Sequence, residues 1–310
     1  MQGLKDLVEV SDADYLSIYE KVILSQTHEG EYILVPYMSM GNFAFEAAIN
    51  ERKCLIYDDN PLIKINFESE FFYPSFAGIR NRLAEIKITR NFPDCGVKCF
   101  LDSKTYDEVM SIRTFLDSAP RDSLNLWIKR LVSETLKMPQ VINNAISTPQ
   151  YFDVKELVLR TYKAVLSNVD PMKILILHYY VPNFFDNESA LDAMLNGRKV
   201  KMAYYAPYTF DPEAYFEKHL LKMWFSNISK EHLNSAQVSK ARDENCEKKN
   251  FLSLHKKLEG GGMIFVEKTK DYNLEGFFKL ALFYGYENLK AFRNTKGNAI
   301  YLLRKLGSSS

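Results

Sequence analysis

Hydrophobic and polar positions follow one another in blocks that predict a mixed α/β fold. Residues 32–35 form a short apolar run and are followed by a turn, and residues 43–50 place apolar side chains at helical spacing. A second apolar run spans residues 54–57 and ends in polar residues. A strand, a tight turn, a helix and a second strand in this order form one half of a nucleotide-binding parallel sheet.

The rest of the chain continues the alternation of helices and strands. The best candidate for a buried strand is residues 172–180, MKILILHYY, whereas residues 199–208 alternate weakly and contain the aromatic run YYAPY. Residues 263–267 predict a strand, and residues 289–293 and 299–304 predict a closing hairpin. Helices are predicted at residues 11–24, 62–72, 79–88, 106–116, 124–136, 154–167, 187–196, 212–225 and 273–284. The polar stretch 231–258 predicts a long surface helix or a partly disordered segment.

Composition describes a soluble globular protein without an overall basic field. The chain has 310 residues, 46% hydrophobic and 25% charged, and its net charge is +1. A nucleic-acid surface would therefore need a local basic patch. The most basic run contains Arg80, Arg82, Lys87 and Arg90, and is interpreted either as a solvated helix face or as a phosphate-contacting face.

Several classes of protein are not indicated by the sequence. Cys95 and Cys99 lack a second cysteine pair or a nearby histidine, so no metal site is expected. The first residues show no basic region followed by an apolar run, and no apolar run of about 18 residues occurs, so neither a secretory signal nor a membrane span is predicted. We expect a cytoplasmic protein, or a nuclear one if the source is eukaryotic.

The stretch around the first turn carries the main functional signal. Residues 35–42 read VPYMSMGN, and they are followed by Glu46-Ala47 and by Asp58-Asp59-Asn60-Pro61. This stretch resembles the cofactor site of the S-adenosylmethionine-dependent DNA amino-methyltransferases, which methylate adenine or cytosine amino groups. Their pattern is D-P-F-x-G-S-G-T, then E-A, then D-x-N-P. The second half is well matched, but Val35 replaces the acid, Ser39 a glycine and Asn42 the threonine.

The resemblance implies a fold, a cofactor and a set of cofactor-binding residues. The fold is an α/β Rossmann-like methyltransferase sheet with an antiparallel C-terminal hairpin and a helical insertion. The end of the chain is similar to the family as well, with Gly260-Gly261-Gly262, a strand, a helix and Gly285-Tyr286 before the hairpin. Asp58 would hold the ribose, and the turn would pass beneath the methionine part. The implied contact residues are Pro36, Tyr37, Ser39, Gly41, Asn42, Asp58 and Asn60.

The family's catalytic motif, D/N/S-P-P-Y/F/W after the fourth strand, is not intact, and two stretches are candidates for it. In the family the first residue accepts hydrogen bonds from the target amino group, and the aromatic residue stacks on the flipped base. The first candidate is His178-Tyr179-Tyr180, at the end of the strongest predicted strand. The second is Thr148-Pro149-Gln150-Tyr151, in which Thr148, Pro149 and Tyr151 match but no good strand precedes them.

The predicted domain organisation has three parts. Residues 1–103 form the N-terminal part of the methyltransferase domain with the cofactor motif, and residues 104–168 a helical insertion. Residues 169–310 form the C-terminal part, in which target recognition is assigned to 183–257 by elimination.

Two functional hypotheses follow, with a third more distant. The chain is either an active DNA methyltransferase with a divergent site, or a degenerate member that binds DNA or acts as a scaffold beside an active methyltransferase or another protein subunit. The degenerate reading is favoured, because Val35 removes a carboxylate near the methionine amino group and a side chain at Ser39 crowds the cofactor. S-adenosylmethionine is the implied cofactor in both cases, although the degenerate reading also allows that its binding has been lost. The third hypothesis is methylation of RNA or of a small molecule.

Overall fold

The computed structural model divides the chain into two compact units. A sheet unit contains Met1–Asn60, Leu175–Phe210 and Ser235–Ser310, and a helical unit contains Pro61–Ile174 and Asp211–Asn234. The structure describes residues 7–36, 42–58, 60–138, 141–142, 145–146, 148–185, 187–206, 211–235, 244–268 and 274–307. Within them, no helix combines the length and the apolar character needed to cross a membrane.

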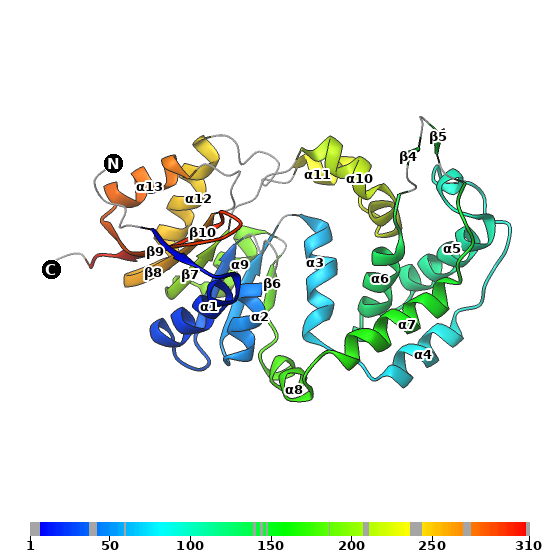
Figure 1. The fold of residues 1–310 in the computed structure, drawn as a ribbon, viewed down its shortest axis with the longest axis horizontal. Coiled ribbons are helices and arrows are strands. Elements are labelled where there is room, and N and C mark those ends of the chain that lie inside the picture. Colours follow the sequence, from blue (N-terminus) through cyan, green and yellow to red (C-terminus); the bar gives the residue numbers. More distant parts are fainter. Residues whose placement is uncertain are drawn as a thin grey trace. The chain divides into compact units, whose positions relative to one another are not determined.

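The sheet unit is built on eight described strands (Figure 1). Their order is β1-β9-β10-β8-β7-β2-β3-β6. Their bounds are β1 (Leu7–Val10), β2 (Tyr32–Pro36), β3 (Lys53–Tyr57), β6 (Asn183–Phe185), β7 (Val200–Tyr205), β8 (Leu258–Lys268), β9 (Tyr286–Asn294) and β10 (Ala299–Lys305).

Strand direction confirms the predicted fold class. β6, β3, β2, β7 and β8 pair in parallel, while β10 is antiparallel to both β8 and β9. The chain therefore makes a parallel Rossmann-like sheet that ends in an antiparallel C-terminal hairpin, as the sequence predicts. β1 adds a parallel strand beside β9 at the edge of the sheet.

Successive residues of a strand point to opposite faces of the sheet, so both faces carry apolar side chains. Helices cover both faces. On one face, Tyr19 and Phe43 pack edge-on at 5.7 Å, and Phe43 stacks on Tyr204 at 4.2 Å. On the other face, buried side chains from three helices pack on Leu34, Leu55 and other strand residues. The first face carries α1 (Asp12–Gln26) and α2 (Asn42–Ile49), and the second carries α9 (Glu188–Leu195), α12 (Glu244–Lys257) and α13 (Glu275–Phe283).

The helical unit has its own core around Trp127 and Tyr162, whose rings meet at 4.9 Å. The Tyr162 hydroxyl donates a 2.6 Å hydrogen bond to the Pro74 carbonyl. Its helices are α3 (Pro61–Glu68), η1 (Ser69–Phe71), α4 (Phe76–Glu85), η2 (Lys98–Phe100), α5 (Ser103–Ser118), α6 (Ser123–Thr135), α7 (Val154–Ser167), α10 (Pro212–Phe225) and α11 (Lys230–Ser235), with a short hairpin of β4 (Val141–Ile142) and β5 (Ala145–Ile146).

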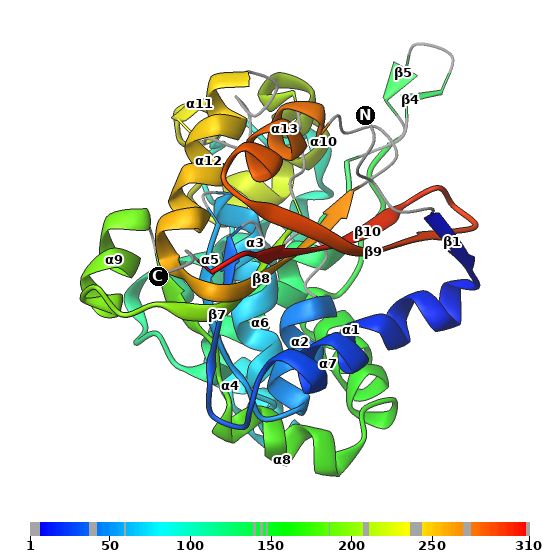
Figure 2. The ribbon, with the colours of Figure 1, turned by 90° about the vertical axis from the view of Figure 1, so that its left-hand side faces the viewer.

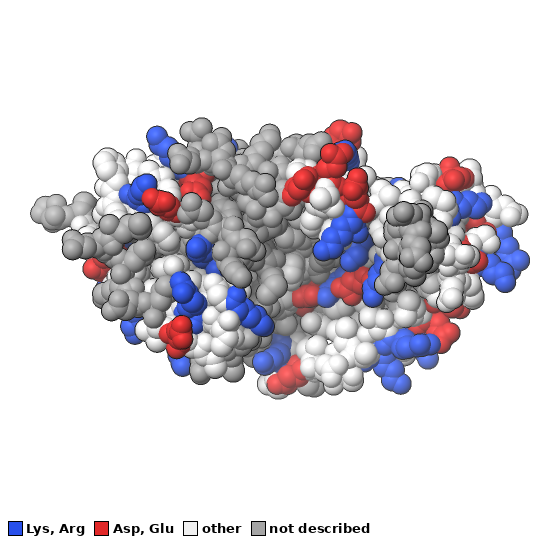
Figure 3. Space-filling view, turned by 45° about the horizontal axis from the view of Figure 1, so that its top comes forward, with Lys and Arg blue, Asp and Glu red and all other residues white. Residues whose placement is uncertain are grey.

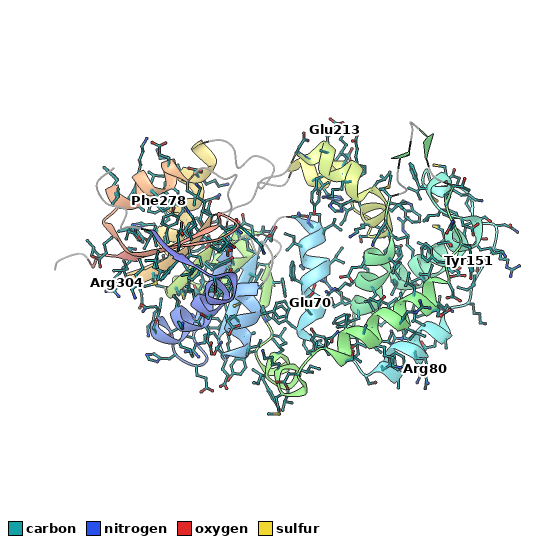
Figure 4. All side chains as sticks on the ribbon, in the orientation of Figure 1. Glu70, Arg80, Tyr151, Glu213, Phe278 and Arg304 are labelled. Carbon is teal, nitrogen blue, oxygen red and sulfur yellow. The ribbon has the colours of Figure 1, made fainter. Side chains whose placement is uncertain are left out.

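A partly buried ion pair anchors α6 in this core. The Arg130 guanidinium lies 4.8 Å from the Trp127 ring and pairs with Glu70, which is labelled in Figure 4, and with Glu134. Burial raises the pKa of Glu70, although the charge of Arg130 opposes that effect. We therefore expect the ion pair to fix the position of α6 in the core and to contribute little to the free energy of unfolding.

The helical unit differs in extent from the insertion expected at residues 104–168. It begins at Pro61, directly after the Asp58-Asp59-Asn60 stretch, and it also takes in 211–234. Residues 183–206 and 244–257, within the segment assigned to target recognition, instead contribute β6, α9, β7 and α12 to the sheet unit.

One strand prediction is wrong. Residues 172–179 belong to a helix, α8 (Pro171–Tyr179), which crosses the boundary between the two units. The Asp170 carboxylate accepts a 2.9 Å hydrogen bond from the backbone N–H of Met172, and Pro171 is the first helical residue. An aspartate cap followed by proline at the first position is a helix start signal, and it outweighs the apolar run.

We expect Glu247 to stabilise α13, which has no capping side chain of its own. The Glu247 side chain is buried and accepts a 3.2 Å hydrogen bond from the backbone N–H of Phe277, in the first turn of α13. Glu247→Ala should lower the free energy of unfolding by about 1–2 kcal/mol, because the N–H groups of the first turn lose their acceptor. Urea unfolding measures this, with the exposed neighbour Lys248→Ala as the control; equal losses would contradict the assignment.

Candidate cofactor site at the strand ends

The central strand of the sheet marks the place where a ligand site is expected. β2 lies between β3 and β7, so the strand order reverses direction at β2. Pro36 pairs with Tyr57, and Leu34 pairs with Ala203, so the last residues of the three strands reach about the same level. In open α/β sheets, ligands bind in the crevice outside the carboxyl ends at such a reversal.

The structure brings several of the predicted cofactor residues to this edge. Pro36 is the last residue of β2 and is buried, and Asn42 is the first residue of α2. Asp58 and Asn60 follow the end of β3. Tyr37, Ser39 and Gly41 lie outside the described residues.

Asp58 is held in place by its own turn. Its Oδ1 accepts a 2.9 Å hydrogen bond from the backbone N–H of Asn60, which is itself buried. Such an Asx turn fixes the carboxylate at the end of the second core strand. A carboxylate at that place can accept hydrogen bonds from the hydroxyls of a ribose.

The end of β2 offers different chemistry. Val35, which replaces the acid of the family pattern, is fully buried and has no polar atom in its side chain. Behind the strand ends, a cavity between Pro36, Tyr57 and Tyr205 and the helices α9 and α12 measures about 10 Å³. That volume holds at most one water molecule, so a cofactor would lie on the strand ends rather than beneath them.

Ion pairs of the buried Lys257 join α9 and α12 beside this cavity. Lys257 Nζ lies 2.7 Å from Glu188 and 2.9 Å from Asp192, and Ser253 also donates a hydrogen bond to Glu188. Burial alone would raise the pKa of Glu188, but the hydrogen bonds from Lys257 and Ser253 and the nearby positive charges lower it overall. The pair therefore fixes the first turn of α9, directly after β6.

Lys257→Met should reduce stability in a pH-dependent manner. Because the pKa of Glu188 is lowered in the folded protein, the stabilisation is present above the ordinary glutamate value of about 4.3 and is lost as pH falls through the lower folded value. We expect a loss of about 1–3 kcal/mol at pH 7, less than for a fully buried pair, since Glu188 is 28% exposed. Urea unfolding at pH 7 and below pH 4 measures it; a loss that does not shrink in acid would contradict the pairing.

The first predicted catalytic stretch lies at the opposite edge of the sheet. The Tyr180 hydroxyl is 3.0 Å from a Glu29 carboxylate oxygen and 3.3 Å from one of Glu51. Glu29 precedes β2 and Glu51 precedes β3, so both mark the amino ends of the strands. Tyr179 is 74% exposed on α8, and the His178 side chain is outside the description. The structure therefore separates this stretch from Asp58.

The alternative stretch belongs to the helical unit. Thr148 and Pro149 line a cavity of about 320 Å³ with residues of η2 and α6, and Tyr151, labelled in Figure 4, donates a 3.0 Å hydrogen bond to Glu108. None of these residues follows a strand of the large sheet. Neither candidate stretch occupies the place that the family motif requires.

That place is the end of β7, the fourth core strand in chain order. The residues there are Tyr205-Ala206-Pro207-Tyr208, which keep a proline and an aromatic residue at the last two positions of the motif. Tyr205 takes the position of the acceptor, but its ring is fully buried against Phe277 at 4.8 Å, and its hydroxyl accepts a 3.4 Å hydrogen bond from Asn250. Pro207 and Tyr208 lie outside the described residues.

A signal for this strand was present in the sequence. The YYAPY run alternates weakly and contains a proline followed by an aromatic residue, but the more apolar run 172–180 is the stronger candidate for the fourth strand by local pattern. Among the described residues, no group of three or more His, Cys, Asp and Glu side chains is placed to hold a metal ion.

Comparison with known proteins identifies only distant structural likenesses. No protein-family model matches the sequence, and no curated protein matches it. An rRNA methylase from Streptococcus thermophilus is 8% identical, with a TM-score of 0.36 over 93% of this chain and 95% of its own. The rRNA methyltransferase aviRa from Streptomyces viridochromogenes is 10% identical, with a TM-score of 0.37 over 94% of this chain and 83% of its own. Likenesses at this level support no inference about substrate.

Proposed function

We propose that this chain binds S-adenosylmethionine across the carboxyl ends of β2 and β3, as a DNA amino-methyltransferase-like protein that does not itself transfer the methyl group. The observation that carries the cofactor assignment is the position of Asp58. It lies directly after β3, beside the reversal of strand order, with its carboxylate fixed by the Asn60 N–H.

The residues at this edge of the sheet can bind the ribose end of S-adenosylmethionine, but they offer no partner for its methionine end. At the ribose end, Asp58 supplies a charged acceptor for two hydroxyl groups. At the methionine end, the buried Val35 supplies no partner for the amino group. S-adenosylmethionine would supply an activated methyl group here, and the chain would hold it mainly through its nucleoside part.

The position of Tyr205 supports a non-catalytic role. Amino-group methylation needs a hydrogen-bond acceptor that grips the target nitrogen beside the methyl donor. In this chain the acceptor position is taken by a buried core tyrosine that packs on Phe277 and accepts a hydrogen bond from Asn250. An active methyltransferase with a divergent site is the second candidate, favoured by Pro207-Tyr208 directly after β7.

The proposed macromolecular partner is DNA, as the resemblance of the cofactor stretch implies. On the face drawn in Figure 3, basic and acidic side chains of the described residues are interspersed, in line with the net charge of +1. Binding would therefore depend on a local patch, and its affinity should fall steeply with salt. A protein subunit that supplies catalysis would be the second partner.

The first test is a calorimetric titration of the full chain with S-adenosylmethionine, with NAD⁺ as a control ligand that also carries adenosine. Saturable binding of S-adenosylmethionine, and none of NAD⁺ at the same concentration, supports the cofactor assignment. Absence of heat, or equal binding of both ligands, overturns it. Methyl-labelled cofactor is then incubated with unmethylated duplex DNA. Incorporation above a no-enzyme control overturns the non-catalytic role and supports the second candidate.

A further inference from the structure

An open groove runs along the sheet unit, away from the cofactor site. It measures about 660 Å³ and lies between α1 and strands β8, β9 and β10. Its floor is mainly apolar and includes Phe292 and Leu302, and Ile18 and Val22 of α1 form the apolar part of one wall. In Figure 2, α1 lies on one side of the β9–β10 hairpin and α13 on the other. On the α1 side, the floor of the groove is the sheet itself.

The position of the groove separates it from Asp58. The groove lies over β8, β10 and β9, and β7 and β2 separate these strands from β3. Asp58 follows the carboxyl end of β3. A ligand in the groove would therefore leave the cofactor site open.

The charges around the groove have one sign. Lys21, Lys290 and Arg304 line it, and none of its described lining residues is acidic. Lys21 and Lys290 are exposed, so their ammonium groups lie at the rim above an apolar floor. An apolar floor with a basic rim is complementary to an amphipathic segment that carries acidic residues.

A second apolar surface lies where α13 ends and β9 begins. Phe283 is 81% exposed and Leu282 is 60% exposed at the end of α13, immediately before β9. Leu306, 52% exposed, follows β10 and donates its backbone N–H to the Gly285 carbonyl at 2.9 Å. Large apolar side chains exposed together are typical of a protein interaction site.

We propose that this groove is a docking site for an acidic amphipathic helix of a partner protein. Apolar residues at positions i, i+3, i+4 and i+7 of that helix would lie on Phe292 and Leu302, and its acidic residues would face Lys21, Lys290 and Arg304. A second copy of this chain fits less well, because a two-fold contact would bring the basic rims together.

The test uses two fluorescein-labelled peptides of 18 residues, designed as amphipathic helices with leucine on one face. One carries glutamate on the polar face, and its analogue carries lysine at the same positions. Fluorescence polarisation with the full chain should give saturable binding of the glutamate peptide, with Kd of about 10–100 µM, and at least about tenfold weaker binding of the lysine peptide.

Charge reversal at the rim provides the second arm. Lys21→Glu with Lys290→Glu should weaken the glutamate peptide at least about tenfold and reverse the preference between peptides. Lys87→Glu with Lys163→Glu, exposed lysines of the helical unit, should change neither affinity. Circular dichroism checks folding of every variant, and Asp58→Ala should bind the peptide normally, since the cofactor assignment is independent.

Three results would overturn the docking proposal. They are no saturable binding of the glutamate peptide up to about 1 mM, equal binding of the two peptides, and unchanged binding in the rim variant. Sedimentation of the unliganded chain adds a fourth: a dimer that the rim reversal or Phe283→Ser dissociates would assign the surface to a second copy instead.

Discussion

Asp58→Ala is expected to reduce the affinity for S-adenosylmethionine by about 100-fold or more. A hydrogen bond to a charged group contributes about 1.5–3 kcal/mol, and a ribose offers two hydroxyls to this carboxylate. The substitution also removes the acceptor for the Asn60 N–H, so the turn after β3 loses its fixed shape. Calorimetric titration of both proteins measures the ratio of dissociation constants.

Asp58→Asn separates the two contributions. Its amide oxygen can still accept the Asn60 N–H and keep the turn, but it has no negative charge and accepts at one oxygen only. We expect an affinity between those of the wild type and Asp58→Ala, lower than wild type by roughly 10-fold. If both variants bind as tightly as the wild type, the ribose does not contact Asp58, and the cofactor assignment fails.

Thermal unfolding gives an independent readout of the same prediction. A ligand that binds only the folded protein adds about 2.7 kcal/mol of stability at 100 times its Kd. The wild type should therefore unfold at a higher temperature in excess S-adenosylmethionine, and Asp58→Ala should not. A shift of equal size in both proteins would contradict a role for Asp58 in binding.

Local signals in the sequence predict the well-defined elements closely. The expected helices at 154–167 and 212–225 agree with α7 and α10 because Asp153 and Asp211 cap them, and proline follows Asp211. β2 and β3 follow from short apolar runs bounded by turns, and β10 and the second half of β9 follow from the predicted hairpin. In each of these, the local pattern and the fold agree.

The wrong predictions occur where a local sequence pattern fits two structures, or where segments that are distant in the chain pack together. An apolar run of nine residues fits a buried strand or a helix, and α8 exposes Met172, Leu175 and Tyr179 on its surface. The helical unit joins 61–174 with 211–234, and no local pattern signals that association. Because the run 172–180 predicts the fourth strand, the sequence places the catalytic motif at Tyr180, which lies at the opposite edge of the sheet from Asp58.

The candidate site was therefore predicted in part. Asp58 and Asn60 follow a strand whose position depends on local pattern, and they lie where the sequence predicts. The residues at the end of the fourth strand depend on which segment pairs with β2. Long-range packing determines that pairing. The pairing of β7 with β2 places Tyr205 at the same edge of the sheet as Asp58.

Replacing Tyr205 by the acceptor of the family motif is expected to destabilise the protein rather than to create activity. Tyr205 is fully buried, stacks on Phe277 at 4.8 Å and accepts a hydrogen bond from Asn250. Tyr205→Asn would remove most of this ring, leave a cavity in the core beneath α12 and α13, and bury an amide there. We expect a loss of about 3–5 kcal/mol in the free energy of unfolding.

Tyr205→Phe is the matched control, because it keeps the ring and removes only the hydroxyl. It should cost about 1 kcal/mol, the net value of one hydrogen bond to a neutral partner. Urea unfolding measures both variants, and labelled methyl transfer to DNA is measured on whatever fraction of Tyr205→Asn remains folded. If Tyr205→Asn is as stable as Tyr205→Phe and gains transfer activity, the side chain at this position can turn into the crevice. The end of β7 would then be a catalytic site that a single substitution had silenced, and the non-catalytic role would be a property of one residue rather than of the packing around it.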